Sequence, residues 1–239
     1  EQMSHIKGHN LQVYAGMIAA LDRSVGKVVQ KLKDLDIYGK TLIIFTSDNG
    51  GANYIELEDI NKPFRGWKIS FFEGGIRVPF IVSWPDKINP GMNSDSAVHH
   101  FDIFPTIASA AQVEPSNERI LDGVDLLPHI KKENSAEPHK TLFWRSGNHQ
   151  SVLHEKWKYI ISIKENKRWL FDTSKDPSEK NNVIESHPNE AKKLEELLQK
   201  FNSEQKEPLF PSAFEAPIMI DKYDGQEYEE GDEYIYWSN

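Results

Sequence analysis

Apolar residues in the first part of the chain recur at a helical period. Over residues 14–35 they are separated by three or four positions, which places them on one face of an amphipathic helix. The residues on this face are Tyr14, Ile18, Leu21, Val25, Val28, Leu32 and Leu35. We therefore predict a helix here that ends near Asp36.

Two short apolar runs follow, each bounded by turn residues. Residues 41–46 stop at a turn-forming tetrapeptide, residues 47–50, and residues 78–84 form the second run. Both runs have the length and composition of strands that are buried on both faces. A helix followed by such a strand predicts α/β layering with parallel strand pairing. Residues 102–111 have helical spacing and are predicted to form a shorter helix.

The last hundred residues have a different pattern. Four short runs rich in aromatic and β-branched residues alternate with tight turns between residues 141 and 172, as in antiparallel hairpins. A helical period returns over residues 188–201, which predicts one helix beside this sheet. The tail after residue 208 is rich in proline, tyrosine and acidic residues, and no pattern fixes its structure.

A polar, turn-rich stretch over residues 115–138 separates the two patterns, so we place a domain boundary there. The predicted division is an α/β domain over residues 1–137 and a small α+β subdomain with its tail over residues 138–239. The sequence has 239 residues, of which 38% are hydrophobic and 27% charged, and this suits a globular protein with one sizeable core and a smaller one.

Charge and residue content exclude several classes of function. The net charge is -9 and the basic residues are scattered among acids, which argues against a nucleic-acid-binding protein. The sequence has no cysteine, so disulfides, thiolate metal sites and cysteine nucleophiles are excluded. No apolar run approaches the roughly 18 residues that a membrane-spanning helix needs.

The turn after the first predicted strand carries candidate metal ligands. Asp48 and Asn49 are adjacent and are followed by two glycines. A carboxylate and an amide carbonyl are hard oxygen ligands of the kind that Ca²⁺ or Mg²⁺ prefers, and ligands collect at strand ends in α/β sheets. Asp, Asn and Gly also form ordinary turns, so the tetrapeptide by itself leaves both interpretations open.

A second block places cations close to this turn in sequence. Arg65, Lys68 and Arg77 lie among glycines, which let the backbone approach an anion closely. This arrangement indicates an anionic substrate. A purely structural alternative is that Glu73 and Arg77, four positions apart, pair with each other.

Taken together, these motifs resemble the type I sulfatases of the alkaline-phosphatase superfamily. The motifs that carry the resemblance are Ser47-Asp48-Asn49-Gly50, Arg65-Gly66-Trp67-Lys68 and Glu73-Gly74-Gly75-Ile76-Arg77-Val78-Pro79. Further segments similar to the C-terminal half of the family are residues 14–28, 100–106, 121–123 and 157–179. The resemblance covers almost the whole chain and implies part of an alkaline-phosphatase-like layered sheet, followed by a small α+β subdomain with an antiparallel sheet.

The resemblance also implies a Ca²⁺ ion and a role for each motif. In the family, the Asp and Asn of the Ser-Asp-Asn-Gly turn bind calcium, which assigns metal ligation to Asp48 and Asn49. The lysine of the Arg-Gly-x-Lys motif contacts the sulfate, which makes Lys68 the expected catalytic and substrate-binding residue. The other charged residues of these motifs are expected to support the loop, namely Arg65, Glu73 and Arg77.

Histidines are weaker candidates. His149 and His154 lie in the second part, which borders the substrate pocket in sulfatases, so we expect His149, with His154 as the alternative, to contact the leaving alcohol. His5 and His9 are left out of the site, since an isolated histidine near a chain end is usually solvated. His100 is expected to close the turn into the following helix by hydrogen bonding.

The family's nucleophile has no counterpart in this sequence. It is a formylglycine made from the first residue of a Cys/Ser-x-Pro-x-Arg motif, and two further aspartates complete the calcium site. No such motif occurs among the 239 residues. The resemblance therefore implies a C-terminal half that is inactive alone and whose expected partner is the missing N-terminal half of the same enzyme.

The expected function is hydrolysis of sulfate esters, with a sulfated carbohydrate as the expected substrate and a periplasmic or secreted bacterial location. One alternative is a phosphodiesterase or phosphonate monoester hydrolase of the same superfamily, although the amide of Asn49 suits a single Ca²⁺ better than the Asp/His sets of many two-metal relatives. Another is a noncatalytic binding protein on a decayed sulfatase fold. The retention of Asp48, Asn49, Lys68 and Arg65 argues against decay.

Overall fold

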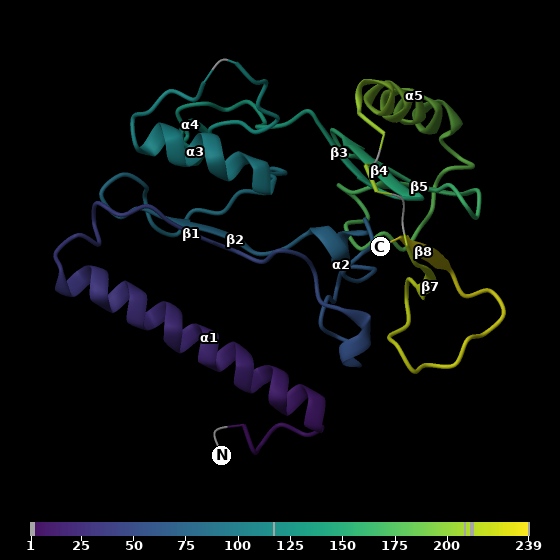
Figure 1. The fold of residues 1–239 in the computed structure, drawn as a ribbon, viewed down its shortest axis with the longest axis horizontal. Coiled ribbons are helices and arrows are strands. Elements are labelled where there is room, and N and C mark those ends of the chain that lie inside the picture. The colour runs from purple at the N-terminus through teal and green to yellow at the C-terminus, as the bar shows by residue number, and fades with distance from the viewer. Residues whose placement is uncertain (1–2, 117, 208, 211–212, 239) are drawn as a thin grey trace. The chain divides into compact units, whose positions relative to one another are not determined.

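The structure is a computed structural model that describes residues 3–116, 118–207, 209–210 and 213–238 (Figure 1). The chain groups into two compact units, Glu1–Thr46 with Phe80–Lys140, and Ser47–Pro79 with Thr141–Asn239. This grouping differs from the division predicted at residue 137. The segment Ser47–Pro79 joins the C-terminal residues because its contacts are mostly with them, as the following paragraphs describe.

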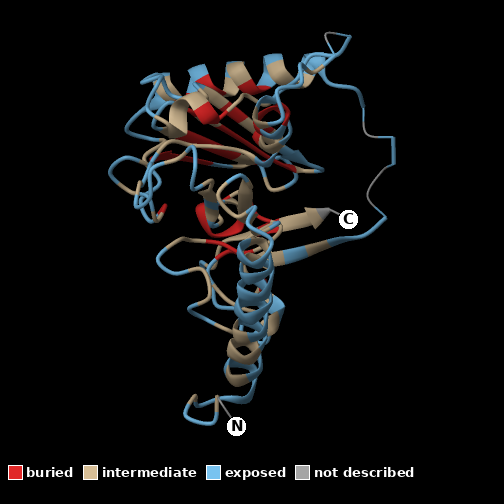
Figure 2. Cartoon of the chain, turned by 90° about the vertical axis from the view of Figure 1, so that its left-hand side faces the viewer, coloured by how far each residue is buried: buried red, intermediate tan, exposed pale blue. Residues whose placement is uncertain are grey.

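The first unit begins with a long helix, α1, over His9–Asp34. The predicted amphipathic helix is confirmed, although none of its residues is buried (Figure 2). Val28 on its apolar face is 60% exposed and Ile18 is 47% exposed. Within the described residues, no helix has the length and apolar character needed to cross a bilayer.

Two strands follow in the first unit, β1 over Ile43–Thr46 and β2 over Phe80–Ser83. They pair antiparallel, with Ile43 opposite Ser83, so the prediction of parallel pairing is wrong. A parallel pair needs a crossover that returns the chain to the same end of the sheet, usually through a helix. The intervening residues contain only two short helical turns, η1 over Asn53–Ile55 and α2 over Glu73–Ile76. Both strands are half-buried, whereas burial on both faces was predicted.

The predicted helix near residue 102 is confirmed as a 3-10 turn, η2 (His100–Asp102), that continues into α3 (Ile103–Ala110). Its start is capped by His99, whose Nδ1 accepts the Phe101 N–H, and by Asp102, whose carboxylate accepts the His99 N–H at 2.7 Å. His99 thus supplies the side-chain cap, and the His100 Nε2 lies 3.3 Å from the Thr46 hydroxyl. A short helix, α4 (Leu127–Ile130), follows.

The second unit is built on a four-stranded antiparallel sheet in the order β3-β4-β5-β6. The strands are β3 (Thr141–Ser146), β4 (His149–His154), β5 (Trp157–Ser162) and β6 (Lys167–Asp172). The predicted helix is α5, Pro188–Glu204, and it packs on this sheet. Ala191, Leu194 and Leu198 of α5 meet Val152, Tyr159 and Leu170 of the strands in one buried cluster. Both predictions for this region are confirmed.

The tail forms a hairpin that the sequence pattern did not predict. Strand β7 (Glu215–Met219) pairs antiparallel with β8 (Tyr234–Ser238). A second buried cluster contains two residues that flank or belong to this hairpin, together with residues of the sheet and of the segment before α2. Its members are Phe72, Ile160, Trp169, Phe171, Ile220 and Ile235. The second unit therefore joins three stretches of sequence around the residues of the candidate site.

Candidate active site

The turn after β1 presents two oxygen-bearing side chains. Asp48 is exposed, and its carboxylate accepts the N–H of Asn49 at 3.0 Å. The Asn49 amide nitrogen donates to the Gly50 carbonyl at 2.8 Å. In the part of the chain that the structure describes, no cation pairs with Asp48 and no donor bonds to the Asn49 side-chain oxygen. Both side chains thus keep oxygen atoms available to a ligand.

These oxygens fit a calcium ion but do not complete a site. A carboxylate and an amide carbonyl are suitable Ca²⁺ ligands, and Ca²⁺ takes roughly six to eight oxygens. The described residues contain no group of three or more His, Cys, Asp or Glu that could hold a metal ion. Any calcium site that includes Asp48 and Asn49 therefore needs ligands from further residues.

Hydrogen bonds join this turn to the loop that carries Lys68. The Lys68 N–H donates to the Gly51 carbonyl at 2.9 Å. The Asn61 side chain accepts the Gly51 N–H at 2.7 Å and donates to the Gly51 and Gly66 carbonyls at 2.9 and 3.0 Å. Together these hydrogen bonds hold the two predicted motifs side by side.

The backbones approach so closely that side chains are excluded. A Cβ on Gly50 would lie 1.7 Å from the Gly74 carbonyl oxygen, and a Cβ on Gly74 would lie 2.3 Å from the Gly66 carbonyl oxygen. The Gly50 N–H also donates to the Gly75 carbonyl at 2.9 Å. Glycine is needed at these positions because any larger residue would separate the turn from the loop.

Lys68 differs from the two arginines with which it was grouped. Its side chain is half-buried, and among the described residues its ammonium has no hydrogen bond or ion pair with a carboxylate. Arg77 pairs with Glu73 at 3.4 Å, as the structural alternative predicted, and lies over the Phe64 ring. Arg65 is paired with acids of the tail. Of the three cations, Lys68 is the one left to bind an anion.

Arg65 is fixed by two carboxylates. Its Nε and Nη2 donate to Asp221 at 2.7 and 2.5 Å, and Nη2 also donates to Glu233 at 2.5 Å. Its guanidinium lies over the Phe72 ring at 5.0 Å from the centroid. Burial opposes its charge, but the bonds to Asp221 and Glu233 outweigh this and raise the pKa of Arg65. Such geometry favours the predicted supporting role.

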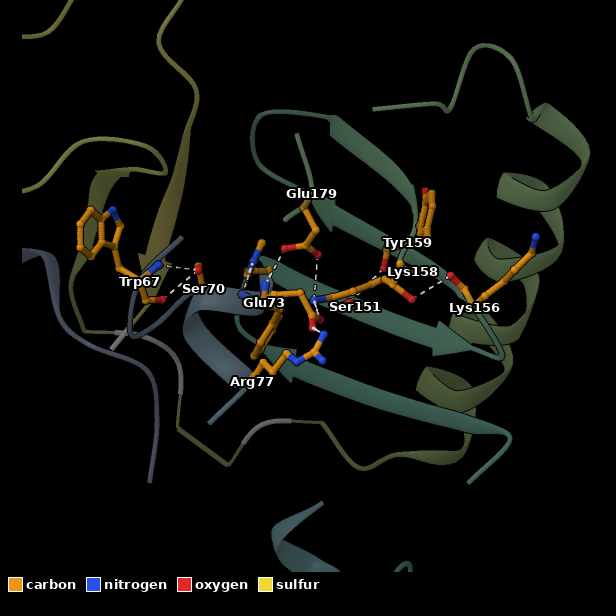
Figure 3. Close-up of polar contacts among 12 residues, drawn as sticks. Trp67, Ser70, Glu73, Arg77, Ser151, Lys156, Lys158, Tyr159 and Glu179 are labelled. Atoms are coloured by element: carbon orange, nitrogen blue, oxygen red, sulfur yellow. Dashed lines mark hydrogen bonds and ion pairs between the residues drawn. The ribbon is translucent and has the colours of Figure 1, made fainter. Parts of the chain in front are cut away.

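Glu73 is held by a buried charge network (Figure 3). Lys158 on β5 is fully buried, and its Nζ lies 2.6 Å from Glu73 and 2.9 Å from Glu179. The Glu73 N–H donates to the Glu179 carboxylate at 2.5 Å. Burial favours the neutral acid, but Lys158 and then Arg77 lower the pKa of Glu73. The network anchors α2, and with it the end of the Lys68 loop, to the sheet.

The histidines lie inside the second unit. His149 is 2% exposed, stacks on Phe71 at 4.9 Å between ring centroids, and accepts the Phe71 N–H on Nε2 at 3.1 Å. Burial, and next the charge of Lys158, lower the pKa of His149 to about 3. His154 is also buried and contacts Thr141 at 2.7 Å. Substrate contact by either residue stays a prediction; the geometry gives His149 a structural role in holding Phe71.

Two family models match the chain. The model described as Sulfatase matches residues 1–113, and the model described as N-sulphoglucosamine sulphohydrolase, C-terminal, matches residues 66–207. The chain belongs to the type I sulfatase family. This sulfatase chain has the predicted fold class, a mixed α/β structure with antiparallel sheets and an alkaline-phosphatase-like fold. Its solved neighbours include a protein described as a sulfatase and one described as a phosphonate monoester hydrolase.

Relatives of known name are sulfatases as well. The chain is 32% identical over 180 residues to the steryl-sulfatase of Rattus norvegicus, covering 73% of this chain and 31% of that protein. It is 30% identical over 207 residues to the N-acetylgalactosamine-6-O-sulfatase of Bacteroides thetaiotaomicron, covering 77% of this chain and 40% of that protein. The sulfatase chain thus spans less than half the length of these relatives.

A solved structure is also similar to most of this chain. The crystal structure of Ps i-CgsB is 30% identical in sequence, with a TM-score of 0.78, and the match covers 87% of this chain and 46% of that one. The same protein has been solved in complex with k-i-k-neocarrahexaose. The similarity extends over most of the sulfatase chain, including both units.

Sequence reasoning missed four residues that hold the site loop in this sulfatase chain: Lys158, Glu179, Asp221 and Glu233. Lys158 carried a local signal, because it is a charged residue inside an otherwise apolar strand. A lysine is rarely fully buried unless it is paired, so its position indicated buried acidic partners. The acids themselves lie far away in sequence and carried no such signal.

Proposed function

We propose that the intact protein containing this chain is a sulfatase that hydrolyses the sulfate ester of a carbohydrate. One observation carries the proposal: the turn bearing Asp48 and Asn49 is hydrogen-bonded to the backbone of Lys68. Two candidate oxygen ligands and an ammonium with no acidic partner among the described residues therefore belong to one hydrogen-bonded assembly. Metal ligands beside a lysine ammonium are what binding of an anionic sulfate ester group requires. Membership of the sulfatase family supports sulfate rather than another oxyanion.

Each residue has a proposed task. Asp48 and Asn49 would hold Ca²⁺ through their side-chain oxygens, with the remaining ligands coming from residues outside this chain. Ca²⁺, when bound, withdraws charge from the sulfuryl oxygens. Lys68 donates hydrogen bonds from its ammonium to a sulfate oxygen and stabilises the negative charge that develops on it. Arg65, Glu73 and Arg77 keep the loop in place through the ion pairs described above.

The nucleophile is proposed to lie outside these residues. The 239 residues contain neither cysteine nor a Ser-x-Pro-x-Arg motif, so the formylglycine expected for the family has no source here. We propose that the N-terminal half of the same enzyme supplies it together with the other calcium ligands, and that residues 1–239 alone are inactive.

Similarity to named relatives supports a substrate class for the proposed enzyme. A carbohydrate ester is supported by the similarity to a protein named N-acetylgalactosamine-6-O-sulfatase and to one solved with k-i-k-neocarrahexaose. We propose a periplasmic or secreted location, in keeping with a calcium-dependent enzyme that acts on polymeric sugars.

The test uses the intact enzyme and compares hydrolysis of an aryl sulfate with that of the matching aryl phosphate, each with and without a calcium chelator. Sulfate hydrolysis should be preferred and chelator-sensitive, and Lys68→Ala should lower kcat/KM by roughly a hundredfold or more, as loss of a transition-state donor does. Lys62→Ala is the matched control, because Lys62 lies in the same loop but is exposed and pairs with Glu58 and Asp59. Preferred hydrolysis of the phosphate would instead support a phosphoesterase. If neither ester is hydrolysed, the result would support a noncatalytic protein.

A further inference from the structure

The hairpin of β7 and β8 lies outside both family matches. These matches end at residues 113 and 207, whereas the hairpin begins at Glu215 and its second strand ends at Ser238. The family's shared residues therefore assign no role to it. Its place in the structure nevertheless connects it to the loop that carries Lys68.

Apolar packing makes the hairpin part of the second unit's core. Ile220, directly after β7, and Ile235 on β8 are each 1% exposed. They share a buried cluster with Phe72, which precedes α2, and with Trp169 of β6. Burial of these apolar side chains stabilises the contact between the hairpin and this cluster.

The polar contacts of the hairpin converge on Arg65. Asp221 follows β7 and Glu233 precedes β8, so the two acids lie at the same end of the hairpin, where the Ile220 N–H donates to the Glu233 carbonyl at 2.9 Å. Both accept hydrogen bonds from the Arg65 guanidinium. Glu233 is itself oriented by the Trp169 Nε1–H at 2.8 Å. Two donor directions of Arg65 are thereby fixed, and a planar guanidinium held in this way cannot rotate.

Backbone hydrogen bonds connect Arg65 to the loop that carries Lys68. The Arg65 carbonyl accepts the Gly74 N–H at 2.7 Å, and Lys68 lies three residues further along with its own N–H bonded to Gly51. A further bond from the tail, Asp224 N–H to the Asn53 carbonyl at 3.1 Å, holds the residues that follow the metal-ligand turn. The tail thus contacts both the loop that carries Lys68, through Arg65, and the residues after the Asp48–Asn49 turn, through Asn53.

We propose that the β7–β8 hairpin is a clamp that positions Lys68, acting through Arg65 as a positioning residue, and that Asp221 and Glu233 are its functional contacts. Without these carboxylates the guanidinium keeps its charge but loses its fixed orientation, and the loop is free to move away from Gly51. The structural part of this proposal stands by itself, while its effect on sulfate binding rests on the proposed function.

The first arm of the test measures amide hydrogen exchange in the intact enzyme. The double variant Asp221→Asn with Glu233→Gln should raise the exchange rates in residues 65–75 by about tenfold or more, the effect expected when hydrogen bonds to a charged group are lost. Exchange in β3 and β4 should stay as in the wild type. The single conservative variant Asp221→Glu keeps a carboxylate at this position. Amide exchange in residues 65–75 of this variant should therefore be much closer to that of the wild type than to that of the double variant.

A matched control lies in the same hairpin loop. Asp232 pairs with Lys222 at 2.7 Å and accepts the Glu229 N–H, without contacting Arg65. Asp232→Asn should leave exchange in residues 65–75 unchanged. Unchanged exchange in the double variant would overturn the proposal, and so would an equal rise over the whole second unit, because either result would mean that the tail does not position this loop in particular.

The second arm measures KM for an aryl sulfate and the inhibition constant of inorganic sulfate. Both constants should rise about tenfold in the double variant and stay within twofold in Asp232→Asn. A hairpin that only stabilises the fold would lower the amount of active enzyme and leave both constants unchanged. If the wild type hydrolyses no sulfate ester, the proposed function fails while the exchange arm still decides the clamp; if activity is present but exchange is unaltered, the clamp alone fails.

Discussion

Lys158 is a charged residue in a largely apolar strand, β5. It stays charged there because two carboxylates lie next to its ammonium. Its side chain is fully buried between Glu73 and Glu179. Burial lowers the pKa of Lys158, but the carboxylates of Glu179 and Glu73 outweigh it and raise that pKa. The network joins β5 to α2, so a single ammonium holds the end of the site loop against the sheet.

Replacing this ammonium should be costly. In Lys158→Met the two carboxylates face each other without a cation, and breaking a buried pair in this way typically costs about 3 to 5 kcal/mol. Urea denaturation of the intact protein would measure the free energy of unfolding. Lys156→Met is the control, because its pair with Asp172 at 3.1 Å is half-exposed and should contribute about 1 kcal/mol or less. Equal, small losses in both variants would contradict the role given to the network.

His149 should make stability depend on pH. Its pKa is about 3 in the folded protein and 6.5 for the free side chain, so the unfolded state takes up the proton first as the pH falls. The stability that it contributes is fully present above pH 6.5 and is lost as the pH falls toward 3. Between pH 7.5 and 5.5 the loss should be about 1.4 kcal/mol.

The measurement is urea denaturation of wild type and His149→Gln at both pH values. Glutamine keeps an acceptor for the Phe71 N–H but does not titrate, so the difference between the two proteins should shrink as the pH falls. A difference that is the same at both values would mean that His149 is not held neutral in the fold.

At the scale of secondary structure, the elements with a clear period were predictable. The steps of three and four residues gave α1 and α5, and the alternation of aromatic runs with tight turns gave β3 to β6. The pairing of β1 with β2 was predicted wrongly because strand direction depends on the route of the residues between them. The β7–β8 hairpin was missed because Pro217 and the many acids of the tail hide its alternation.

In the candidate site, too, local patterns were predictable from the sequence and long-range contacts were not. The motifs that carry Asp48, Asn49 and Lys68 are local and could be read from the sequence, and the i,i+4 pair of Glu73 with Arg77 was one of the alternatives. The contact of Arg65 with Asp221 spans 156 positions. No local pattern encodes such a contact, because it depends on the path of the chain through the whole second unit.

Close packing between α2 and the turn that carries Asp48 and Asn49 gives a prediction at this scale. Gly50→Ala would put its Cβ 1.7 Å from the Gly74 carbonyl oxygen and force the two segments apart. Calcium affinity of the intact enzyme, measured by titration calorimetry, should fall about tenfold or more, because affinity depends on the rigidity of the ligand set. Gly26→Ala in α1 is the control: nothing lies within 4 Å of that position, and helix propensity predicts a gain of up to about 1 kcal/mol. Equal calcium affinity in both variants would contradict the packing argument.

For the whole molecule, calcium should stabilise the folded enzyme. A ligand that binds only the folded state, present at 100 times its dissociation constant, adds about 2.7 kcal/mol to the free energy of unfolding. Differential scanning calorimetry of the intact enzyme should therefore show a lower Tm after chelation, and Asp48→Asn should reduce the difference. If chelation leaves the Tm of the wild type unaltered, Asp48 and Asn49 do not hold a resident cation.

The apolar face of α1 has a consequence for any experiment on this stretch of chain alone. Met17 is 65% exposed and Val28 is 60% exposed, along a helix of 26 residues without a buried side chain. Water contact along this face is unfavourable, so any surface that covers it, including the same face of a second copy, is bound in preference. Folding and association are then coupled by mass action. We therefore expect the melting temperature of residues 1–239 in isolation to rise with the protein concentration at which it is measured.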